Sequence, residues 1–321
     1  MTNSGIKTGE NELIVFSGTS NPELAEEICR ILGRPLGQAL IRTFSDGEIF
    51  VEIKENVRGR DVFVIQPTST PVNANLIELL IMIDALKRAS ANSITAVMPY
   101  YGYARQDSKV APRVPISAKL VADLIAVAGA SRVLSMDLHR GQIQGFFNIP
   151  VDHLFAAPVQ MEYVRGSFPK DIVIVSPDVG GVERARRFAE GLDTDLAIVD
   201  RREDTPPDSE TFAIIGDVRS RVVLIMDDIV DTGTTIIQAA EALKAYGASH
   251  IYSCVTHPVL SGESLKRIEA SPIERLVVTN TIRLSEQAKK ADWIECLSVA
   301  NLLSEAILRI HYNDSVSSLF V

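Results

Sequence analysis

Residues 222–246 combine side chains and a spacing that are typical of an anion-binding site. Five apolar residues, 222–226, predict a buried strand, and the carboxylates Asp227 and Asp228 follow it directly. The loop 231–235, Asp-Thr-Gly-Thr-Thr, then precedes apolar residues at helical spacing. Backbone N–H groups at a helix N-terminus attract an anion, and glycine allows a phosphate to approach closely.

This pattern predicts a phosphate site beside two hydrogen-bond acceptors, as a sugar phosphate requires. The two carboxylates either accept hydrogen bonds from sugar hydroxyls or hold a metal ion. An isolated Asp-Thr-Gly is more typical of an acidic strand end with an ordinary helix cap. The complete pattern of strand, carboxylates, loop and helix favours the sugar-phosphate site.

The elements that position this loop occur twice in the chain. A strand at 13–16 and a helix at 22–32 correspond to a strand at 172–175 and a helix at 182–192. Asn-Val-Arg at 56–58 and Asp-Val-Arg at 217–219 precede further matching strands. The repeat predicts two copies of one α/β unit, each with a mostly parallel sheet.

The two copies differ where the chemistry is expected. The first copy has Gln-Pro-Thr-Ser-Thr-Pro-Val-Asn at 66–73 where the second has its carboxylates and Asp-Thr-Gly loop. Ligands of open α/β sheets bind beyond the C-terminal ends of the strands. We therefore expect the second copy to hold the sugar phosphate and the first copy to have taken another task.

Three other loops carry candidate groups. The loop 100–109 offers aromatic rings and Arg105 to a polyphosphate, although a solvated basic loop has the same composition. His139 follows a predicted strand and suits a metal or a phosphate if an acid such as Asp178 lies opposite, but a lone histidine is more often structural. Residues 44–48 join two predicted strands, as a hairpin turn does.

Residues 201–210 form a fourth segment of interest, rich in charge and proline. A long loop of this composition is either a mobile flap over a site or a disordered linker.

Composition limits the class of protein. The 321 residues suffice for one or two domains, and a formal charge of −9 argues against nucleic acid or an anionic membrane as a partner. Residues 1–12 lack the apolar run of a signal peptide, and the most apolar stretch, 76–86, is too short to span a bilayer. Three scattered cysteines fit reduced thiols: Cys29, Cys254 and Cys296. We expect a cytoplasmic protein.

A set of motifs from Leu13 to Phe320 carries a family resemblance. They are Phe-Ser-Gly-Thr-Ser (16–20), Phe-Ser-Asp-Gly-Glu (44–48), Tyr-Ala-Arg-Gln-Asp (103–107), Met-Asp-Leu-His (136–139), Gln-Ile-Gln-Gly-Phe-Phe (142–147), Ser-Pro-Asp-Val-Gly-Gly (176–181), the loop 227–235, Glu-Ala-Ile-Leu-Arg-Ile-His (305–311) and Asp-Ser-Val-Ser (314–317). Together they resemble the ribose-phosphate diphosphokinase family, the enzymes that make phosphoribosyl pyrophosphate.

The resemblance implies an α/β fold with two tandem phosphoribosyltransferase-like domains. Residues 1–155 would form the ATP side, and residues 156–303 the ribose 5-phosphate side. A C-terminal helix at 304–321 would pack back on the first domain. The family's assembly implies a homo-oligomer built from dimers, commonly a hexamer, with ATP and ribose 5-phosphate as substrates and Mg²⁺ as cofactor.

The resemblance also implies roles for individual residues. The ATP-binding set is Phe44, Asp46, Gly47, Glu48, Arg105, Gln106, Asp107 and His139, with residues 44–48 reaching the adenine of a neighbouring subunit. His139 and Asp178 would serve the metal. The ribose 5-phosphate set is Glu203, Asp227, Asp228, Asp231, Thr232, Gly233, Thr234 and Thr235. Arg58 and Ser315 match an allosteric phosphate or ADP site, and Arg201 and Arg202 are the expected catalytic cations.

The chain departs from the family pattern in the flap. The family has Lys, any residue and Arg where this chain has Arg201, Arg202 and Glu203. Arginine keeps the lysine's charge with a different shape, but Glu203 inverts the sign. A smaller departure is Thr234, where the family usually has glycine.

These departures leave two alternatives to an active diphosphokinase. One is a weakly active or inactive paralogue that assembles with an authentic synthetase and regulates it. The other is a phosphoribosyltransferase that consumes the product. The duplication and the loops at 105–107 and 137–139 argue against the transferase, which needs only one such domain.

Overall fold

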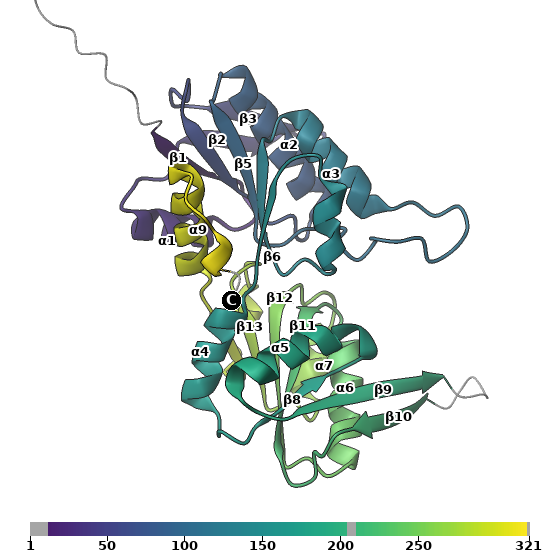
Figure 1. The fold of residues 1–321 in the computed structure, drawn as a ribbon. Coiled ribbons are helices and arrows are strands. Elements are labelled where there is room, and N and C mark those ends of the chain that lie inside the picture. The colour runs from purple at the N-terminus through teal and green to yellow at the C-terminus, as the bar shows by residue number, and fades with distance from the viewer. Residues whose placement is uncertain (1–11, 204–209, 320–321) are drawn as a thin grey trace, which may run out of the picture. The chain divides into compact units, whose positions relative to one another are not determined.

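The computed structural model describes residues 12–203 and 210–319 (Figure 1). These residues divide into two compact units. The first unit combines the chain up to Leu154 with the segment that starts at Ala300, and the second comprises Phe155–Val299. Each unit is built around its own parallel sheet.

The sheet of the first unit has five parallel strands in the order β1-β4-β5-β6-β7. Their bounds are Leu13–Ser17, Asp61–Ile65, Ser93–Met98, Arg132–Met136 and Val151–Leu154. The helices α1, Pro22–Leu32, and α9, Ala300–Tyr312, lie on one side, and α2, Val72–Arg88, and α3, Ser117–Ala128, on the other (Figure 1). A separate antiparallel hairpin joins β2, Ala39–Thr43, to β3, Ile49–Ile53.

Local sequence signals set the bounds of α1. Asn21 caps the helix by accepting a hydrogen bond from the Leu24 N–H at 3.4 Å, and Pro22 occupies the first turn. Gly33 ends the helix in the left-handed conformation, with φ of 65°. The expected helix at 22–32 is therefore confirmed to the residue.

The C-terminal helix α9 packs against α1 in the first unit. His311 Nδ1 lies 3.0 Å from Asp61 Oδ2 at the start of β4. Burial raises the pKa of Asp61, but hydrogen bonds from Asn92, Ser93 and His311 outweigh this effect and hold it below its ordinary value. The contact fixes the end of α9 to the start of β4, an interior strand of the first sheet.

The sheet of the second unit has seven strands in the order β10-β9-β8-β11-β12-β13-β14, parallel except for the β9–β10 pair. The strands are β8 Val173–Ser176, β9 Leu196–Glu203, β10 Glu210–Ile215, β11 Val222–Val230, β12 His250–Pro258, β13 Arg275–Thr279 and β14 Ile294–Leu297. The helices are α4 Ala157–Ser167, α5 Val182–Leu192, α6 Thr234–Ala245, α7 Ser264–Glu269 and α8 Glu286–Lys289. A short 3₁₀ turn lies at Val179–Gly181 in this unit, and two others lie at Gly141–Phe146 and Ser317–Leu319 in the first unit.

The topology shows the internal repeat directly. In both units the first strand is followed by a hairpin, and the remaining parallel strands then add in sequence order on the other side of that first strand. The hairpins differ: β9 joins the second sheet, whereas β2 and β3 stay apart, and a single bridge between Val15 and Leu36 marks the equivalent pairing. The α/β class with two mostly parallel sheets is confirmed.

Two segments differ from the sequence-based expectation. The strand β11 continues through Asp227 and Asp228 to Val230, because its extra residues still pair with β12. Residues 201–203 and residue 210, expected in a loop, instead belong to the strands of an antiparallel hairpin, in which Glu203 pairs with Glu210. Residues 204–209, between these two strands, lie outside the described part of the chain. None of the helices within 12–203 and 210–319 is long and apolar enough to cross a membrane.

Candidate functional site

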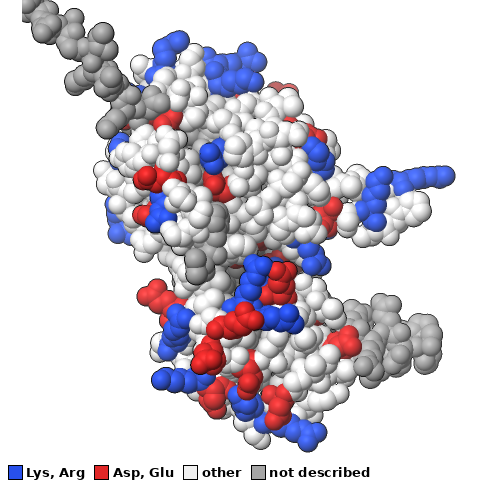
Figure 2. All heavy atoms as spheres, in the orientation of Figure 1, with Lys and Arg blue, Asp and Glu red and all other residues white. Residues whose placement is uncertain are grey.

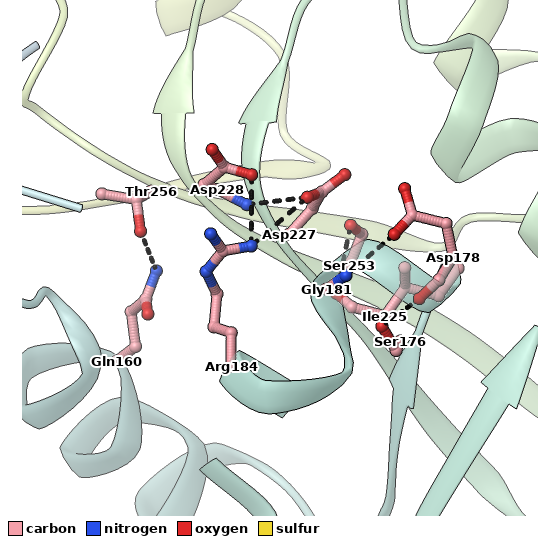
Figure 3. A network of polar contacts seen from close by, with 10 residues as sticks. All are labelled: Gln160, Ser176, Asp178, Gly181, Arg184, Ile225, Asp227, Asp228, Ser253 and Thr256. Carbon is pink, nitrogen blue, oxygen red and sulfur yellow. Dashed lines mark hydrogen bonds and ion pairs between the residues drawn. The ribbon is translucent and has the colours of Figure 1, made fainter. Parts of the chain in front are cut away.

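The carboxylates Asp227 and Asp228 lie on β11 and share one guanidinium group (Figure 3). Arg184 projects from α5, and its Nη1 lies 3.1 Å from Asp228 Oδ1 and 3.6 Å from Asp227 Oδ1. The Asp228 N–H also donates to Asp227 Oδ1 at 2.9 Å. The Asp228 side chain is 5% exposed and that of Asp227 is 16% exposed, so a ligand reaches Asp227 more easily.

Burial governs the electrostatics of this pair. It raises the pKa of Asp227 well above the ordinary value, and the neighbouring charge of Asp228 raises it further. Arg184 and the Asp228 N–H act in the opposite direction. The two adjacent carboxylates offer acceptors that suit hydroxyl groups, and the guanidinium of Arg184 donates to them.

The loop after β11 opens helix α6. Gly233 adopts φ of 79°, and a Cβ atom there would lie 3.0 Å from Ile268 Cγ1, so both conformation and space favour glycine. Thr232, Thr234 and Thr235 are exposed. The N-terminus of the 12-residue helix therefore faces solvent with hydroxyl groups around it, as an anion site requires.

Asp231 is held at the base of this loop. The Ser261 hydroxyl donates to its side chain, and the Ser261 N–H donates to its carbonyl oxygen at 3.2 Å. The structure thus brings Asp227, Asp228 and the loop 231–235 together at the end of β11, as expected from the sequence.

Asp178 follows the neighbouring strand β8. Its Oδ1 accepts the Gly181 N–H at 2.8 Å, and the Ser176 hydroxyl donates to its carbonyl oxygen at 2.7 Å. Figure 3 shows Asp178 on the same rim of the second sheet as Asp227. Part of its hydrogen-bonding capacity therefore holds its own loop in shape.

Two functional candidates escaped the sequence analysis. Arg184 neutralises the carboxylate pair, and Arg267, on α7, donates to Thr232 and Thr234 of the phosphate loop. Both arginines stand on helices whose patterns resemble ordinary solvated faces. The one available signal for Arg184 was its position three residues after the Gly-Gly of the Asp178 loop.

The first copy treats its equivalent loop differently. Gln66 stands at the position of Asp227, and its Nε2 donates to Glu78 Oε1 at 2.8 Å. The Thr19 N–H donates to the same carboxylate at 2.6 Å, and the Thr19 hydroxyl donates at 2.8 Å. Glu78 is 5% exposed, so a buried carboxylate of the protein itself lies beside Gln66 and joins it to Thr19, in the loop after β1.

The candidate nucleotide residues of the first unit lie on loops. His139 follows β6 and is half-buried, and the preceding Leu138 N–H donates to His153 Nε2 at 2.8 Å. Gln106 Oε1 accepts the Ser117 hydroxyl at 2.6 Å, which ties the 105–107 loop to the start of α3. Figure 2 shows positively charged side chains on the projecting loop that precedes α3.

Residues 44–48 form the tip of the β2–β3 hairpin. The Gly47 N–H donates to Phe44 O at 3.0 Å, and the Glu48 N–H donates to Asp46 Oδ1 at 3.0 Å. The Arg42 guanidinium lies 5.0 Å from the centre of the Phe44 ring. The tip is therefore an ordered, exposed aromatic and charged surface.

The remaining candidates are placed less tightly. Arg58 lies in a turn in which its N–H donates to Asn56 Oδ1 at 3.1 Å, and Ser315 lies beyond α9, where its carbonyl accepts from Arg309 at 3.0 Å. Both belong to the first unit. Arg201, Arg202 and Glu203 are the last residues of β9, and their side chains lie outside the described part of the structure.

Residues 13–129 match the N-terminal domain of ribose phosphate pyrophosphokinase, and residues 203–321 match the phosphoribosyl synthetase-associated domain. A ribose-phosphate pyrophosphokinase of Wolinella succinogenes is 54% identical over 96% of this chain and 98% of its own length. One from Caldanaerobacter subterraneus is 57% identical over 97% of this chain and 98% of its own.

A solved structure gives the same result. The crystal structure of phosphoribosylpyrophosphate synthetase from Mycobacterium smegmatis has a TM-score of 0.90 and 41% sequence identity, and the match covers 94% of this chain and 100% of that one. The similarity therefore extends over both units.

Proposed function

The chain belongs to the ribose-phosphate pyrophosphokinase family, and we propose that it transfers the diphosphoryl group of ATP to the C1 hydroxyl of ribose 5-phosphate. The products are phosphoribosyl pyrophosphate, for nucleotide biosynthesis, and AMP. The observation that carries this proposal is the Asp227–Asp228 pair beside the open loop 231–235 at the start of α6. A phosphate cradle next to hydroxyl acceptors matches the two ends of ribose 5-phosphate.

In this proposal each group of the second unit has a task. The loop 231–235 holds the 5-phosphate through N–H groups, hydroxyls and the helix dipole. Asp227 and Asp228 accept hydrogen bonds from the ribose hydroxyls, and Arg184 keeps both carboxylates available as acceptors. The sugar is then fixed with its C1 hydroxyl exposed to the second substrate.

We assign ATP to the first unit, residues 1–155 with the C-terminal segment, and ribose 5-phosphate to residues 156–303. Arg105, Gln106, Asp107 and His139 bind the nucleotide, and the hairpin tip, with Phe44, Asp46, Gly47 and Glu48, contacts the adenine of a neighbouring subunit. The exposed ring at that tip suits base stacking. Arg58 and Ser315 form the allosteric phosphate or ADP site.

Mg²⁺ is the proposed cofactor, with His139 and Asp178 as its protein ligands. No cluster of three or more His, Cys, Asp or Glu residues with metal-binding geometry occurs among the described residues. Magnesium that arrives on a nucleotide usually takes one or two protein ligands and completes its shell with phosphate oxygens and water, so it does not require such a cluster. When bound, it neutralises negative charge on the phosphates.

The chemical step joins the C1 oxygen of ribose 5-phosphate to the β-phosphorus of ATP. The bond from this phosphorus to the oxygen bridging the α- and β-phosphates breaks, AMP leaves with that oxygen, and the proton of the C1 hydroxyl passes to solvent. Arg201 and Arg202, at the end of β9, supply the cations that stabilise the transferring group, and Glu203 belongs to the ribose 5-phosphate side. The positions of these residues at the end of a hairpin support a closing lid.

We further propose a cytoplasmic homohexamer built from dimers. Leu120, Leu124 and Val127 form an exposed apolar row on α3 that supports a subunit interface. Cys29, Cys254 and Cys296 are not joined in disulfides, which fits a reducing compartment. Light scattering of the purified protein measures the size of the assembly.

The central experiment compares wild type with a double variant, Asp227→Asn with Asp228→Asn. We expect AMP release from ATP and ribose 5-phosphate in the wild type, and loss of ribose 5-phosphate binding with intact ATP binding in the variant. Asp217→Asn, in the turn between β10 and β11, is the control. Unchanged sugar-phosphate affinity in the double variant contradicts the assignment of the site, and a wild type without AMP release supports the regulatory paralogue instead.

A further inference from the structure

Arg267 reaches the phosphate loop from outside. Its Nη1 donates to the Thr232 carbonyl oxygen at 3.1 Å, and its Nη2 donates to Thr234 Oγ1 at 3.2 Å. The two contacts lie on either side of Gly233, whose left-handed conformation shapes the turn. One guanidinium thus spans the tightest part of the loop.

The charges around the loop explain why a cation is needed there. Asp227, Asp228 and Asp231 bring three carboxylates to this end of β11. Residues 231–235 contain no Lys or Arg, and Arg184 is engaged by the Asp227–Asp228 pair. A phosphate dianion entering the loop meets repulsion from these carboxylates, and a cation in contact with the loop offsets it.

The donated hydrogen bonds also prepare the loop for an anion. A carbonyl oxygen that points at a phosphate repels it, and the bond from Arg267 partly neutralises the Thr232 oxygen. Because Thr234 Oγ1 accepts from Arg267, its own proton remains to be donated, and the Thr232 hydroxyl 3.0 Å away lies within reach of the same group. Arg267 is exposed, so its guanidinium is accessible to a bound phosphate as well.

We propose that Arg267 is a positioning and specificity residue of the 5-phosphate site. It fixes the Thr232–Thr234 turn, and its charge makes the site prefer a phosphorylated sugar to the free sugar. This inference rests on the proposed function of the loop as the site of ribose 5-phosphate.

The test compares Arg267→Gln and Arg267→Lys with Lys266→Gln. Lys266 is the adjacent residue on α7 and is paired with Glu263 at 2.6 Å, so its variant removes the same charge without touching the loop. We expect Arg267→Gln to raise KM for ribose 5-phosphate by about 10- to 100-fold, with kcat and KM for ATP nearly unchanged. Arg267→Lys recovers part of the affinity because it keeps the charge and loses the planar fork, and Lys266→Gln behaves as wild type.

Calorimetry with ribose 5-phosphate and with ribose tests specificity. In Arg267→Gln the preference for the phosphorylated sugar should fall by the same factor as the affinity, and the remaining binding should depend less on salt. An unchanged preference, or a loss of kcat and ATP affinity at constant ribose 5-phosphate affinity, overturns the inference and indicates a merely structural arginine.

Failure of the inference is distinguishable from failure of the proposed function. If wild type binds no ribose 5-phosphate, the function of the loop is wrong, and Arg267 loses its role with it. If wild type binds the sugar phosphate and Arg267→Gln binds it equally well, only the inference about Arg267 is wrong. Thermal unfolding followed by Trp293 fluorescence confirms that each variant is folded.

Discussion

Arg184→Met tests whether one arginine holds the two carboxylates of the sugar site together. The substitution keeps an apolar stem and removes the charge, so that Asp227 and Asp228 repel each other without a counterion. We expect a loss of stability that is largest at alkaline pH and shrinks as the solution is acidified.

The magnitude follows from distance and burial. Two unit charges 4 Å apart interact by about 4 kcal/mol at an effective dielectric constant of 20. The Arg184 side chain is 26% exposed, so solvent screens part of this energy. The Asp228 side chain is only 5% exposed, so water cannot solvate its charge when Arg184 is removed. We therefore expect the variant to lose about 2 to 3 kcal/mol at pH 8, less than the loss for a fully buried pair.

The pH dependence has a definite sign. Burial already raises the pKa of Asp227 in the folded protein, and the lowering effect of Arg184 disappears in the variant, so its folded pKa rises further. The folded state then binds more protons than the unfolded state over a wider range, and its stability falls as the pH rises through that range. Below the ordinary pKa of an aspartate, both states are protonated and the two proteins converge.

Urea unfolding between pH 5 and pH 9 measures this difference. Trp293 is the chain's single tryptophan and lies in the second unit, so its fluorescence reports on the unit that contains the pair. Arg187→Met is the control, because the Arg187–Glu183 pair lies on the same helix with both side chains more than half exposed and should contribute at most about 0.5 kcal/mol. A loss in Arg184→Met that matches the control, or one that is constant across pH, refutes the reasoning.

Three further predictions concern the turn, the C-terminal helix and the flap. Gly233→Ala should lower the affinity for ribose 5-phosphate about tenfold in calorimetry, because alanine is strained at φ of 79° and its Cβ crowds the core. His311→Ala should weaken the hydrogen bonding that lowers the pKa of Asp61. The stability that a lowered carboxylate pKa contributes is present above the unfolded-state pKa and is lost as the pH falls. Acid unfolding of the variant, followed by circular dichroism, should therefore begin at a higher pH. Arg201→Ala should lower kcat about a hundredfold at constant KM in the AMP-release assay, whereas Glu203→Arg should keep or raise activity.

Short-range signals predicted the fold well. The spacing of apolar residues and the caps gave α1 and α5 with correct bounds, and the repeat gave the equivalent sheets of both units. The prediction was wrong at the end of β11 and in β9, where strands continue through charged residues. Charged residues do not match the apolar pattern from which strands are predicted. They can still lie in a strand, because backbone pairing depends on the neighbouring strand rather than on the side chains of the strand itself.

Long-range contacts escaped the sequence for a related reason. Arg184 meets Asp228 across 44 residues, and Arg267 meets Thr234 across 33. Neither pair has a spacing that local periodicity detects, since the contacts arise when separate helices pack on one sheet. The loop 231–235 could be predicted because its functional residues follow one another in the sequence. Arg184 and Arg267, which contact the site, are distant from it in the sequence.

The loop 227–235 of the second copy and its counterpart at 66–73 in the first copy differ in their acceptors. In the second copy the loop 231–235 after β11 is exposed at its threonines, and Asp227 and Asp228 precede it as acceptors. In the first copy the equivalent loop begins with Gln66, whose amide donates to the buried Glu78, and the same carboxylate also accepts from Thr19 in the loop after β1. In the proposed function the nucleotide of the first unit is therefore bound by other loops, through Arg105, Gln106 and His139, and the hairpin tip 44–48 serves a neighbouring subunit.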